Sequence, residues 1–357
     1  MISENRVANF TLENVNIVSN GDIVAAVIAY PYYTNVENIT VKGNVNIKGR
    51  DYTAGVLAYT RRCVNVNNIA VEANEGSVVE GRMTVGGIIS DIQTNGGLKA
   101  NYSNFATSGL TVKGSKMVGG ISGIICNQTL NGAAVENVTI VCDDVRKGAI
   151  SGALGGASVI TDAVVNNVEG AERLIGSTYN AGDECTVTIN GVVYEYLANG
   201  ACKVDGTVVV DNNDQFQAAI AAGETSIVLG KGTFDLPSSL TQTEGTLTII
   251  GAGVEETILN GAMNTNGNHP GNYANGVALE FEGLTFKTAN NGYNGGFGHA
   301  VSVTFRESKI VGQFYAHSSA PHYFYNCTID PLTGYLYTYG SDCVFEGCTF
   351  AASEGKA

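Results

Sequence analysis

Tyrosine is the residue type that most suggests binding chemistry in this chain. Of its 17 tyrosines, eight fall within one stretch, at positions 273, 293, 315, 323, 325, 335, 337 and 339. Tyr335, Tyr337 and Tyr339 alternate, so in a strand they would share one face, and with Leu336 turned to the core they would face solvent. An exposed tyrosine offers a flat apolar ring and a hydroxyl group, which together suit a sugar.

These tyrosines predict a ligand-binding face in the second half of the chain, beside a predicted loop at 262–276. The candidate residues are Tyr273, Tyr315, Tyr325, Tyr335, Tyr337 and Tyr339. A stacked sugar would gain about 1–3 kcal/mol per ring, by analogy with bases that stack on aromatic side chains. The alternative is that the same rings fill or cap the interior of the fold, and their exposure distinguishes the two.

Paired carboxylates, which glycoside hydrolysis requires, are scarce. Asp143 and Asp144 are adjacent, but neighbours in a strand point to opposite faces, and the segment around them has the composition of a turn. Glu280 and Glu282 would share a face, where the repeat described below places Arg306 beside Glu282. That alignment predicts an ion pair between neighbouring repeats rather than a catalytic pair. We expect no catalytic residue, and no acidic cluster of the kind that holds calcium.

Histidine and cysteine give no metal signature. The histidines stand at 269, 299, 317 and 322, a spacing that matches no standard zinc motif, and we expect them on the surface near loops or edges. The eight cysteines include no Cys-x-x-Cys pair. Cys185 and Cys202 flank a predicted hairpin and could form a disulfide, but the interpretation we prefer for all eight is a small buried hydrophobe. We therefore predict neither a metal nor a cofactor.

Composition restricts the class of protein and its partners. The chain is 44% hydrophobic and 15% charged, which is too apolar for a disordered protein. Its 46 glycines lack the triplet period of collagen, and its apolar runs are too short to cross a bilayer. A formal net charge of −14 disfavours binding to nucleic acid or to an anionic membrane surface. Low charge with abundant Val, Ile, Gly, Asn and Thr indicates a β protein with tight turns.

A repeated hexamer predicts the fold. Its positions one, four and six are mostly apolar and its position three is most often Asn or Gly. It begins at Leu12, Val36, Val66, Thr107, Val135, Val165, Phe281, Phe305, Phe324 and Phe345. Positions four to six alternate like a half-buried strand, and the gap before them requires a bend that Asn and Gly tolerate. A strand, a bend and a second strand repeated along the chain are typical of a parallel β-helix.

Stacked coils place equivalent residues in ladders about 4.8 Å apart. We therefore expect the four phenylalanines Phe281, Phe305, Phe324 and Phe345 to lie in neighbouring coils. For the same reason, we expect Asn14, Asn38, Asn68 and Asn137 to occupy one shared column of bends.

A second motif of small residues followed by aliphatic residues recurs out of phase with the hexamer. It occurs at 24–30, 53–59, 85–91, 118–124 and 148–154. None of these segments has the spacing of a phosphate-binding glycine loop, so we predict that the small residues allow strands to pack closely.

The two arrays are joined by a different kind of sequence. Asn190-Gly191 between two alternating segments predicts a β-hairpin in a linker at 180–206. The following segment predicts a short amphipathic helix at 212–222, with a polar start and a closing Gly223. Such a helix would cover the open strand edges at the end of a second β-helix. The chain is thus expected to have two arrays, at 1–179 and 207–357.

Two families share these motifs. The Val-Gly-Gly-Ile segments, over roughly 7–170, resemble the GLUG-type repeats of bacterial surface proteins. The later hexamers resemble the pectin-lyase-like superfamily, and their Phe-x-Asn/Gly-Cys-Thr-Ile/Phe pattern looks most like that of pectin methylesterases. The resemblance implies an all-β, right-handed parallel β-helix, here as two tandem arrays with a linker hairpin and a capping helix.

The methylesterase resemblance does not extend to its catalytic chemistry. That family carries its two catalytic aspartates just after successive hexamers. The corresponding positions here hold Phe314 or Tyr315, and Tyr335 or Leu336. Without these carboxylates the chain has neither the nucleophile nor the general acid, so the resemblance implies no esterase activity.

Together these features predict a non-catalytic bacterial cell-surface or adhesin-like protein that binds a polysaccharide or a host or cell-surface glycan. The alternatives are a polysaccharide-active lyase, hydrolase or esterase, and a phage tail-spike-like protein. We expect an extracellular or cell-surface location without membrane insertion. No secretory signal precedes the first repeat, so we expect either that a signal was removed or that the chain is a piece of a longer protein.

Overall fold

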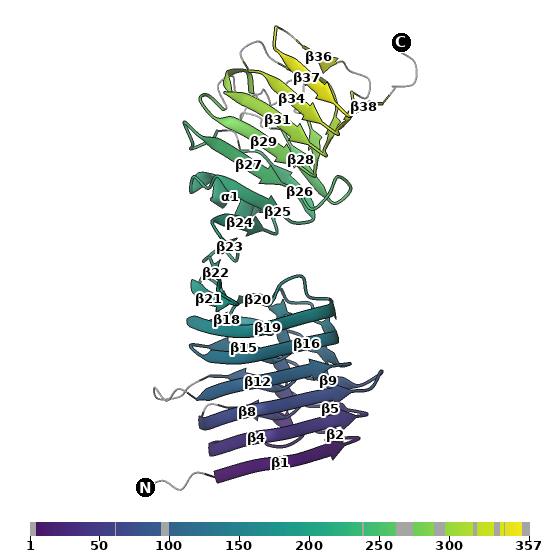
Figure 1. Cartoon of the computed structure of the whole chain (residues 1–357), viewed down its shortest axis with the longest axis vertical. Coiled ribbons are helices and arrows are strands. Elements are labelled where there is room, and N and C mark those ends of the chain that lie inside the picture. The colour runs from purple at the N-terminus through teal and green to yellow at the C-terminus, as the bar shows by residue number, and fades with distance from the viewer. Residues whose placement is uncertain are drawn as a thin grey trace. The chain divides into compact units, whose positions relative to one another are not determined.

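The computed structural model describes residues 5–60, 62–93, 100–237, 239–261, 274–288, 297–316, 320–331, 336–338 and 340–351. The chain forms two compact units, Met1–Gly200 and Ala201–Ala357. Strands dominate the described part of both (Figure 1), and neighbouring coils pair in parallel. The expected all-β class, with coils of parallel strands, is therefore confirmed.

Each coil of the first unit contributes one long strand to a first sheet. The long strands are β1 (Asn5–Glu13), β4 (Tyr32–Gly43), β8 (Arg62–Ala73), β12 (Asn101–Ser108), β16 (Thr129–Val141) and β19 (Ala157–Glu169). Short strands extend the same face: β2 (Asn16–Val18), β5 (Asn46–Lys48), β9 (Val78–Glu80) and β13 (Thr111–Lys113). The register places Val7, Val36, Val66, Tyr102, Leu130 and Ile160 in one ladder. Because successive side chains in a strand point to opposite faces, the side chains of this ladder point into the core.

Two further sheets complete each coil. One contains β3 (Ile23–Ala25), β6 (Tyr52–Ala54), β10 (Thr84–Gly86), β14 (Met117–Gly119) and β17 (Lys147–Gly148). The other contains β7 (Leu57–Tyr59), β11 (Ile89–Ile92), β15 (Ser122–Cys126), β18 (Ser151–Gly155) and β20 (Ile175–Thr178). These are the segments of the small-residue motif, and a Cβ on Gly87 would collide with the backbone oxygen of Gly120. The predicted packing role of these glycines is confirmed.

The bends of the first sheet form two columns, not the single column that we predicted. The first contains Asn9, Asn38, Asn68, Asn104, Gly132 and Asp162, and the second contains Asn14, Gly43, Gly109, Asn137 and Asn167, all with positive φ. Asn14 and Asn137 thus lie apart from Asn38 and Asn68. The alignment was wrong because the hexamer pattern can occur at either bend of a coil, as it does at both Val7 and Leu12 in the first coil.

The first unit ends in an antiparallel hairpin. β21 (Cys185–Ile189) and β22 (Val192–Tyr196) pair around the turn Asn190-Gly191, where φ is 51° and 87°. β21 also pairs in parallel with β19. The hairpin predicted within 180–206 is therefore present, and its two strands continue the sheet of the first unit.

The second unit is built from shorter coils. β23 (Cys202–Val204) and β24 (Thr207–Val210) form a hairpin. β24 is also the first strand of a parallel sheet, which continues in order with β25 (Ser226–Leu229), β27 (Thr246–Ile250), β29 (Ala278–Glu282), β31 (Ser302–Arg306), β34 (His322–Tyr325) and β37 (Cys343–Glu346). A second parallel sheet contains β26 (Gly232–Asp235), β28 (Thr257–Asn260), β30 (Thr285–Lys287), β32 (Lys309–Val311), β35 (Thr328–Asp330) and β38 (Thr349–Phe350). A two-stranded pair consists of β33 (Phe314–Tyr315) and β36 (Leu336–Tyr337). A 3-10 turn spans Phe297–His299.

The predicted helix is α1 (Asn213–Ala221), beside the first strands of this unit. Asn212 is its N-cap, and its Oδ1 accepts a hydrogen bond of 3.0 Å from the backbone N–H of Gln215. Phe216 and Ile220 are fully buried, and the Phe216 ring lies 6.0 Å from that of Phe234. The helix therefore closes its end of the second unit with its apolar side.

The predicted phenylalanine ladder is confirmed. Phe281, Phe305, Phe324 and Phe345 are register partners in successive coils. Their ring centroids are 4.9, 5.6 and 4.8 Å apart in that order, with nearly parallel planes. The first three are fully buried and Phe345, in the last coil, is half-buried. This stack forms the core of the second unit and fixes its register.

Candidate functional site

Two of the predicted tyrosines form a stacked pair on the second unit. Tyr315 of β33 and Tyr337 of β36 are register partners, with ring centroids 4.3 Å apart and planes inclined by 14°. Tyr337 is 37% exposed, while Leu336 before it is half-buried and Phe314 before Tyr315 is fully buried. The Nε2 of Gln313 donates a hydrogen bond of 3.3 Å to the Tyr315 hydroxyl. Alternation in these two strands thus turns both tyrosines outward, as we expected for Tyr337.

The rest of the predicted tyrosine face is divided. Tyr273, Tyr335 and Tyr339, and most of the predicted loop at 262–276, lie outside the described residues. Tyr325 lies on β34, in a different sheet from the Tyr315–Tyr337 pair. The structure therefore brings together Tyr315 and Tyr337 and places Tyr325 on a separate surface.

Tyr325 belongs to a mixed aromatic and charged surface. Its ring is parallel to that of Tyr323, with centroids 6.4 Å apart, and the Arg306 guanidinium lies 4.7 Å from the Tyr325 centroid. Glu282 is beside Arg306 in register, as predicted, but the described residues show no ion pair between them. The expected ion pair is wrong because the weakly hydrated guanidinium stacks on the aromatic ring of the next coil instead.

Two of the four carboxylates that we considered for catalysis, Asp144 and Glu280, have structural partners. Asp144 is bonded to Arg146 at 2.6 Å, and this contact holds the pKa of the Asp144 carboxyl below its usual value. Glu280 accepts a hydrogen bond of 3.2 Å from the Thr248 hydroxyl. Glu280 and Glu282 do alternate on the outward face of β29, so this is the acidic pair that shares a sheet face with Tyr323 and Tyr325.

One histidine differs from its prediction. His299 is exposed as expected, but His322 is fully buried, with Nδ1 2.8 Å from the backbone oxygen of Ala320 and 3.2 Å from the Ser341 hydroxyl. Its side chain points inward because it stands two residues before the core residue Phe324 in β34. His269 and His317 lie outside the described residues.

The cysteines form neither a disulfide nor, within the described ranges, a metal site. None of the eight cysteines forms a disulfide, and Cys185 and Cys202 are both buried. Within the described ranges, no group of three or more His, Cys, Asp or Glu side chains is arranged to hold a metal ion. None of the helices among the described residues is long and apolar enough to cross a membrane.

The first unit carries a polar surface that the sequence analysis did not identify. Amide ladders run across its coils: Asn65 Nδ2 donates to Asn35 Oδ1 at 2.8 Å, and Asn101 Nδ2 donates to Asn65 Oδ1 at 2.8 Å. With Arg6, Glu37, Asn67 and Ser103 they line a shallow depression of about 510 Å³. The signal was present, because each of these asparagines precedes an inward residue by one position. The sequence prediction rested on the bend residues alone, so it did not include the column of Asn35, Asn65 and Asn101.

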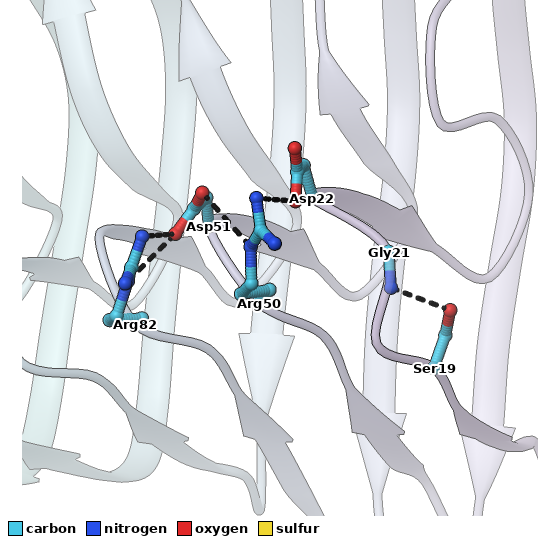
Figure 2. Close-up of polar contacts among 6 residues, drawn as sticks. All are labelled: Ser19, Gly21, Asp22, Arg50, Asp51 and Arg82. Carbon is cyan, nitrogen blue, oxygen red and sulfur yellow. Dashed lines mark hydrogen bonds and ion pairs between the residues drawn. The ribbon is translucent and has the colours of Figure 1, made fainter.

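Charged side chains also form ladders between coils of the first unit. Figure 2 shows Arg50 between Asp22 and Asp51, and Arg82 on the far side of Asp51. Asp51 is mostly buried and Arg82 binds it at 2.6 Å. In the same figure the Gly21 N–H donates to the Ser19 hydroxyl at 3.0 Å. Each carboxylate here has a guanidinium partner, so this cluster joins coils and offers no free nucleophile.

Comparisons of the chain with protein-family models, with curated proteins and with solved structures returned no match. The resemblances to GLUG-type repeats and to pectin-lyase-like proteins therefore stay predictions.

Proposed function

We propose that this chain is a non-catalytic, adhesin-like protein of the bacterial cell surface or extracellular space that binds glycan on its second unit. The Tyr315–Tyr337 pair carries the proposal, because it is a stacked aromatic pair of which Tyr337 is substantially exposed. A sugar ring can cover the apolar face of such a ring while its hydroxyl groups bond to the phenol. One pair supports only weak affinity, so display of many copies on a surface would supply the avidity.

We also propose a handedness and two family relationships for this fold. We infer that both arrays wind right-handed, because parallel strands joined by a crossover adopt this hand in about 98% of cases. The motif resemblances support GLUG-type repeats in the first unit and a pectin-lyase-like β-helix in the second. The methylesterase resemblance carries no catalytic function to this chain, since Phe314 or Tyr315, and Tyr335 or Leu336, stand where a methylesterase would have its aspartates.

A polysaccharide-active enzyme is the second candidate, because of Glu280 and Glu282. Their alternate positions in β29 turn both side chains to one face, with Cα atoms roughly 6.6 Å apart. Glycoside hydrolases hold their two carboxyl groups about 5–10 Å apart, a distance that two such side chains can span. Against it, Glu280 is bonded to Thr248 and the surface beside Glu282 is filled by Arg306 on Tyr325. We therefore rank binding above catalysis.

A glycan array with wild-type protein and Tyr337→Ala tests binding. The variant should lose at least tenfold in retention on any glycan that the wild type binds, with a nearly unchanged melting temperature. Tyr30→Ala is the matched control, because Tyr30 is 47% exposed and stacks on Tyr59 at 5.2 Å in the first unit. Loss of binding in the Tyr30 variant alone would place the site on the first unit and contradict the proposal.

Release of reducing ends from the bound polysaccharide tests catalysis. We expect none from the wild-type protein. Release that disappears in Glu282→Gln while glycan retention persists would instead establish the enzyme.

A further inference from the structure

Three successive coils of the second unit carry a hydroxyl or thiol group at one equivalent position. Ser308, Cys327 and Cys348 each stand directly before a strand of the second sheet, and the register of β32, β35 and β38 places the three residues in one column. The backbone N–H of Thr328 donates to the Ser308 oxygen at 2.9 Å, and that of Thr349 donates to the Cys327 oxygen at 2.8 Å. The main chain therefore fixes this column.

The side chains of the column share one orientation. Each donates a hydrogen bond to the backbone oxygen of the residue two positions earlier, at 2.7 Å from Ser308 Oγ, 3.3 Å from Cys327 Sγ and 3.5 Å from Cys348 Sγ. Each thiol also donates to a backbone oxygen of the preceding coil, at 3.4 Å for Cys327 and 3.3 Å for Cys348. The Cys348 thiol thus lies against the coil that carries Cys327.

The two thiols meet the backbone requirement for a disulfide. Neighbouring strands lie about 4.8 Å apart, and disulfides join cysteines whose Cα atoms are about 4.4–6.8 Å apart. Their side chains already interact, since burial raises the pKa of the Cys327 thiol to about 11 and the neighbouring Cys348 thiol raises it further. Cys343, in the same coil as Cys348, instead has His322 as its register partner.

Burial sets the order in which the two thiols can react. Cys327 is fully buried, whereas Cys348 is half-buried. An oxidant from solvent therefore reaches Cys348 first. Cys327 is shielded from solvent, so it reacts with a sulfur that is already held in the column.

We propose that Cys327 and Cys348 are an oxidation site, at which a small-molecule disulfide converts the two thiols into a covalent bond that joins successive coils and stabilises the second unit. The thiolate of Cys348 attacks one sulfur of the oxidant, whose S–S bond breaks and releases one thiol. Cys327 Sγ then attacks Cys348 Sγ in the mixed disulfide and displaces the second thiol. The two cysteine sulfurs are oxidised, the two sulfurs of the oxidant are reduced, and the cysteine protons pass to the released thiols.

The bond closes a ring through the coil between the two cysteines, which includes β36 and Tyr337. A ring of this kind restricts the unfolded chain and so favours the folded one. Neither the reaction nor this stabilisation depends on the proposed glycan binding.

Peptide mass spectrometry of the full, folded chain after incubation with oxidised glutathione at pH 8 tests the proposal. Asp342 and Glu346 stand between the three cysteines of this region, so a protease that cuts after acidic residues places each cysteine in its own peptide. With the remaining thiols alkylated, Cys327 linked to Cys348 should be the main disulfide, and dithiothreitol should reverse it.

Two serine variants of this coil are the controls. Cys348→Ser should abolish the link to Cys327, and the fold should tolerate it because Ser308 already occupies the same column. Cys343→Ser is the matched control and should leave the link unchanged, since Cys343 faces His322 in register.

Oxidation in urea separates the effect of the fold from that of the sequence. In the unfolded chain the nearest cysteine to Cys348 is Cys343, so the main link should change from Cys327–Cys348 to Cys343–Cys348. A folded wild type that keeps glutathione on Cys348, or that links Cys348 to Cys343 as in urea, would overturn the proposal.

Urea denaturation followed by circular dichroism tests the stabilisation. The oxidised wild type should unfold at a higher urea concentration than the reduced wild type, whereas Cys348→Ser should unfold at the same concentration after either treatment. An oxidised wild type that carries the Cys327–Cys348 link but unfolds no later than the reduced form would refute the stabilising role.

Discussion

Asn38 and Asn68 show what the repeated asparagines of the first unit do. Both have φ of 55°, a left-handed geometry that costs most residues roughly 1–2 kcal/mol. Asn38 Nδ2 donates to Asn9 Oδ1 at 2.8 Å, and Asn68 Nδ2 donates to Asn38 Oδ1 at 2.9 Å. Asparagine thus meets two requirements at once. Its backbone tolerates the bend, and its side-chain amide forms hydrogen bonds with the asparagines of the neighbouring coils.

Replacement of Asn38 separates these two roles. Asn38→Ala should lower the free energy of unfolding by about 1–2 kcal/mol, because alanine strains the bend and loses the ladder. Asn38→Gly should cost less, since glycine adopts the bend freely. Asn46→Ala is the matched control: Asn46 donates to Asn16 Oδ1 at 2.7 Å but is not in a left-handed bend. Urea denaturation measures all three, and an equal cost for the alanine and glycine variants of Asn38 would refute the strain argument.

Two buried thiols should resist alkylation. Burial raises the pKa of the Cys63 thiol to about 12 and that of Cys327 to about 11. A raised thiol pKa keeps the neutral form dominant, so at pH 8 the reactive thiolate of Cys63 is only about 10⁻⁴ of the total. We expect slow reaction of both with iodoacetamide at pH 8 in the folded protein and fast reaction in urea, read by peptide mass spectrometry. Fast labelling of Cys63 without denaturant would contradict its burial.

At the scale of elements, how well each part could be predicted depends on whether its pattern occurs once or twice per coil. The phenylalanines occur once, so their ladder followed directly from alignment. Each coil has two bends in this sheet, and an asparagine at either bend satisfies the same hexamer, so Asn14 and Asn38 could not be assigned to separate columns. His322 was expected at the surface by residue type, although alternation with Phe324 turns it inward. The polar face of Asn35 and Asn65 was not predicted, because the alignment followed the bend residues and not the outward residues that precede each inward one.

The phenylalanine ladder predicts a graded loss of stability along the second unit. Phe305 is fully buried between Phe281 and Phe324, so Phe305→Ala should cost about 3–5 kcal/mol of unfolding free energy. Phe345→Ala should cost less, because Phe345 is only half-buried. Denaturant unfolding followed by circular dichroism measures both. Equal costs would mean that something covers the last coil in solution.

At the scale of the whole molecule, charge decides which glycans can approach. The chain carries a formal net charge of −14, and several basic side chains are already paired with carboxylates, among them Lys42, Arg82 and Arg146. The remaining field repels polyanions over distances of about 10 Å at 0.1 M salt.

The proposed binding face should therefore select neutral over acidic polymers. Retention of a neutral glycan by the Tyr315–Tyr337 pair relies on stacking, so it should hardly change between 0.05 and 0.5 M salt. Polygalacturonate should not be retained at low salt, and any retention should increase as salt screens the repulsion. Affinity chromatography on both polymers makes the comparison, with Tyr337→Ala as the control for specific binding. Tight binding of polygalacturonate at low salt would show that a local basic surface outweighs the net charge, and Arg306 beside Tyr325 would then be the residue to replace.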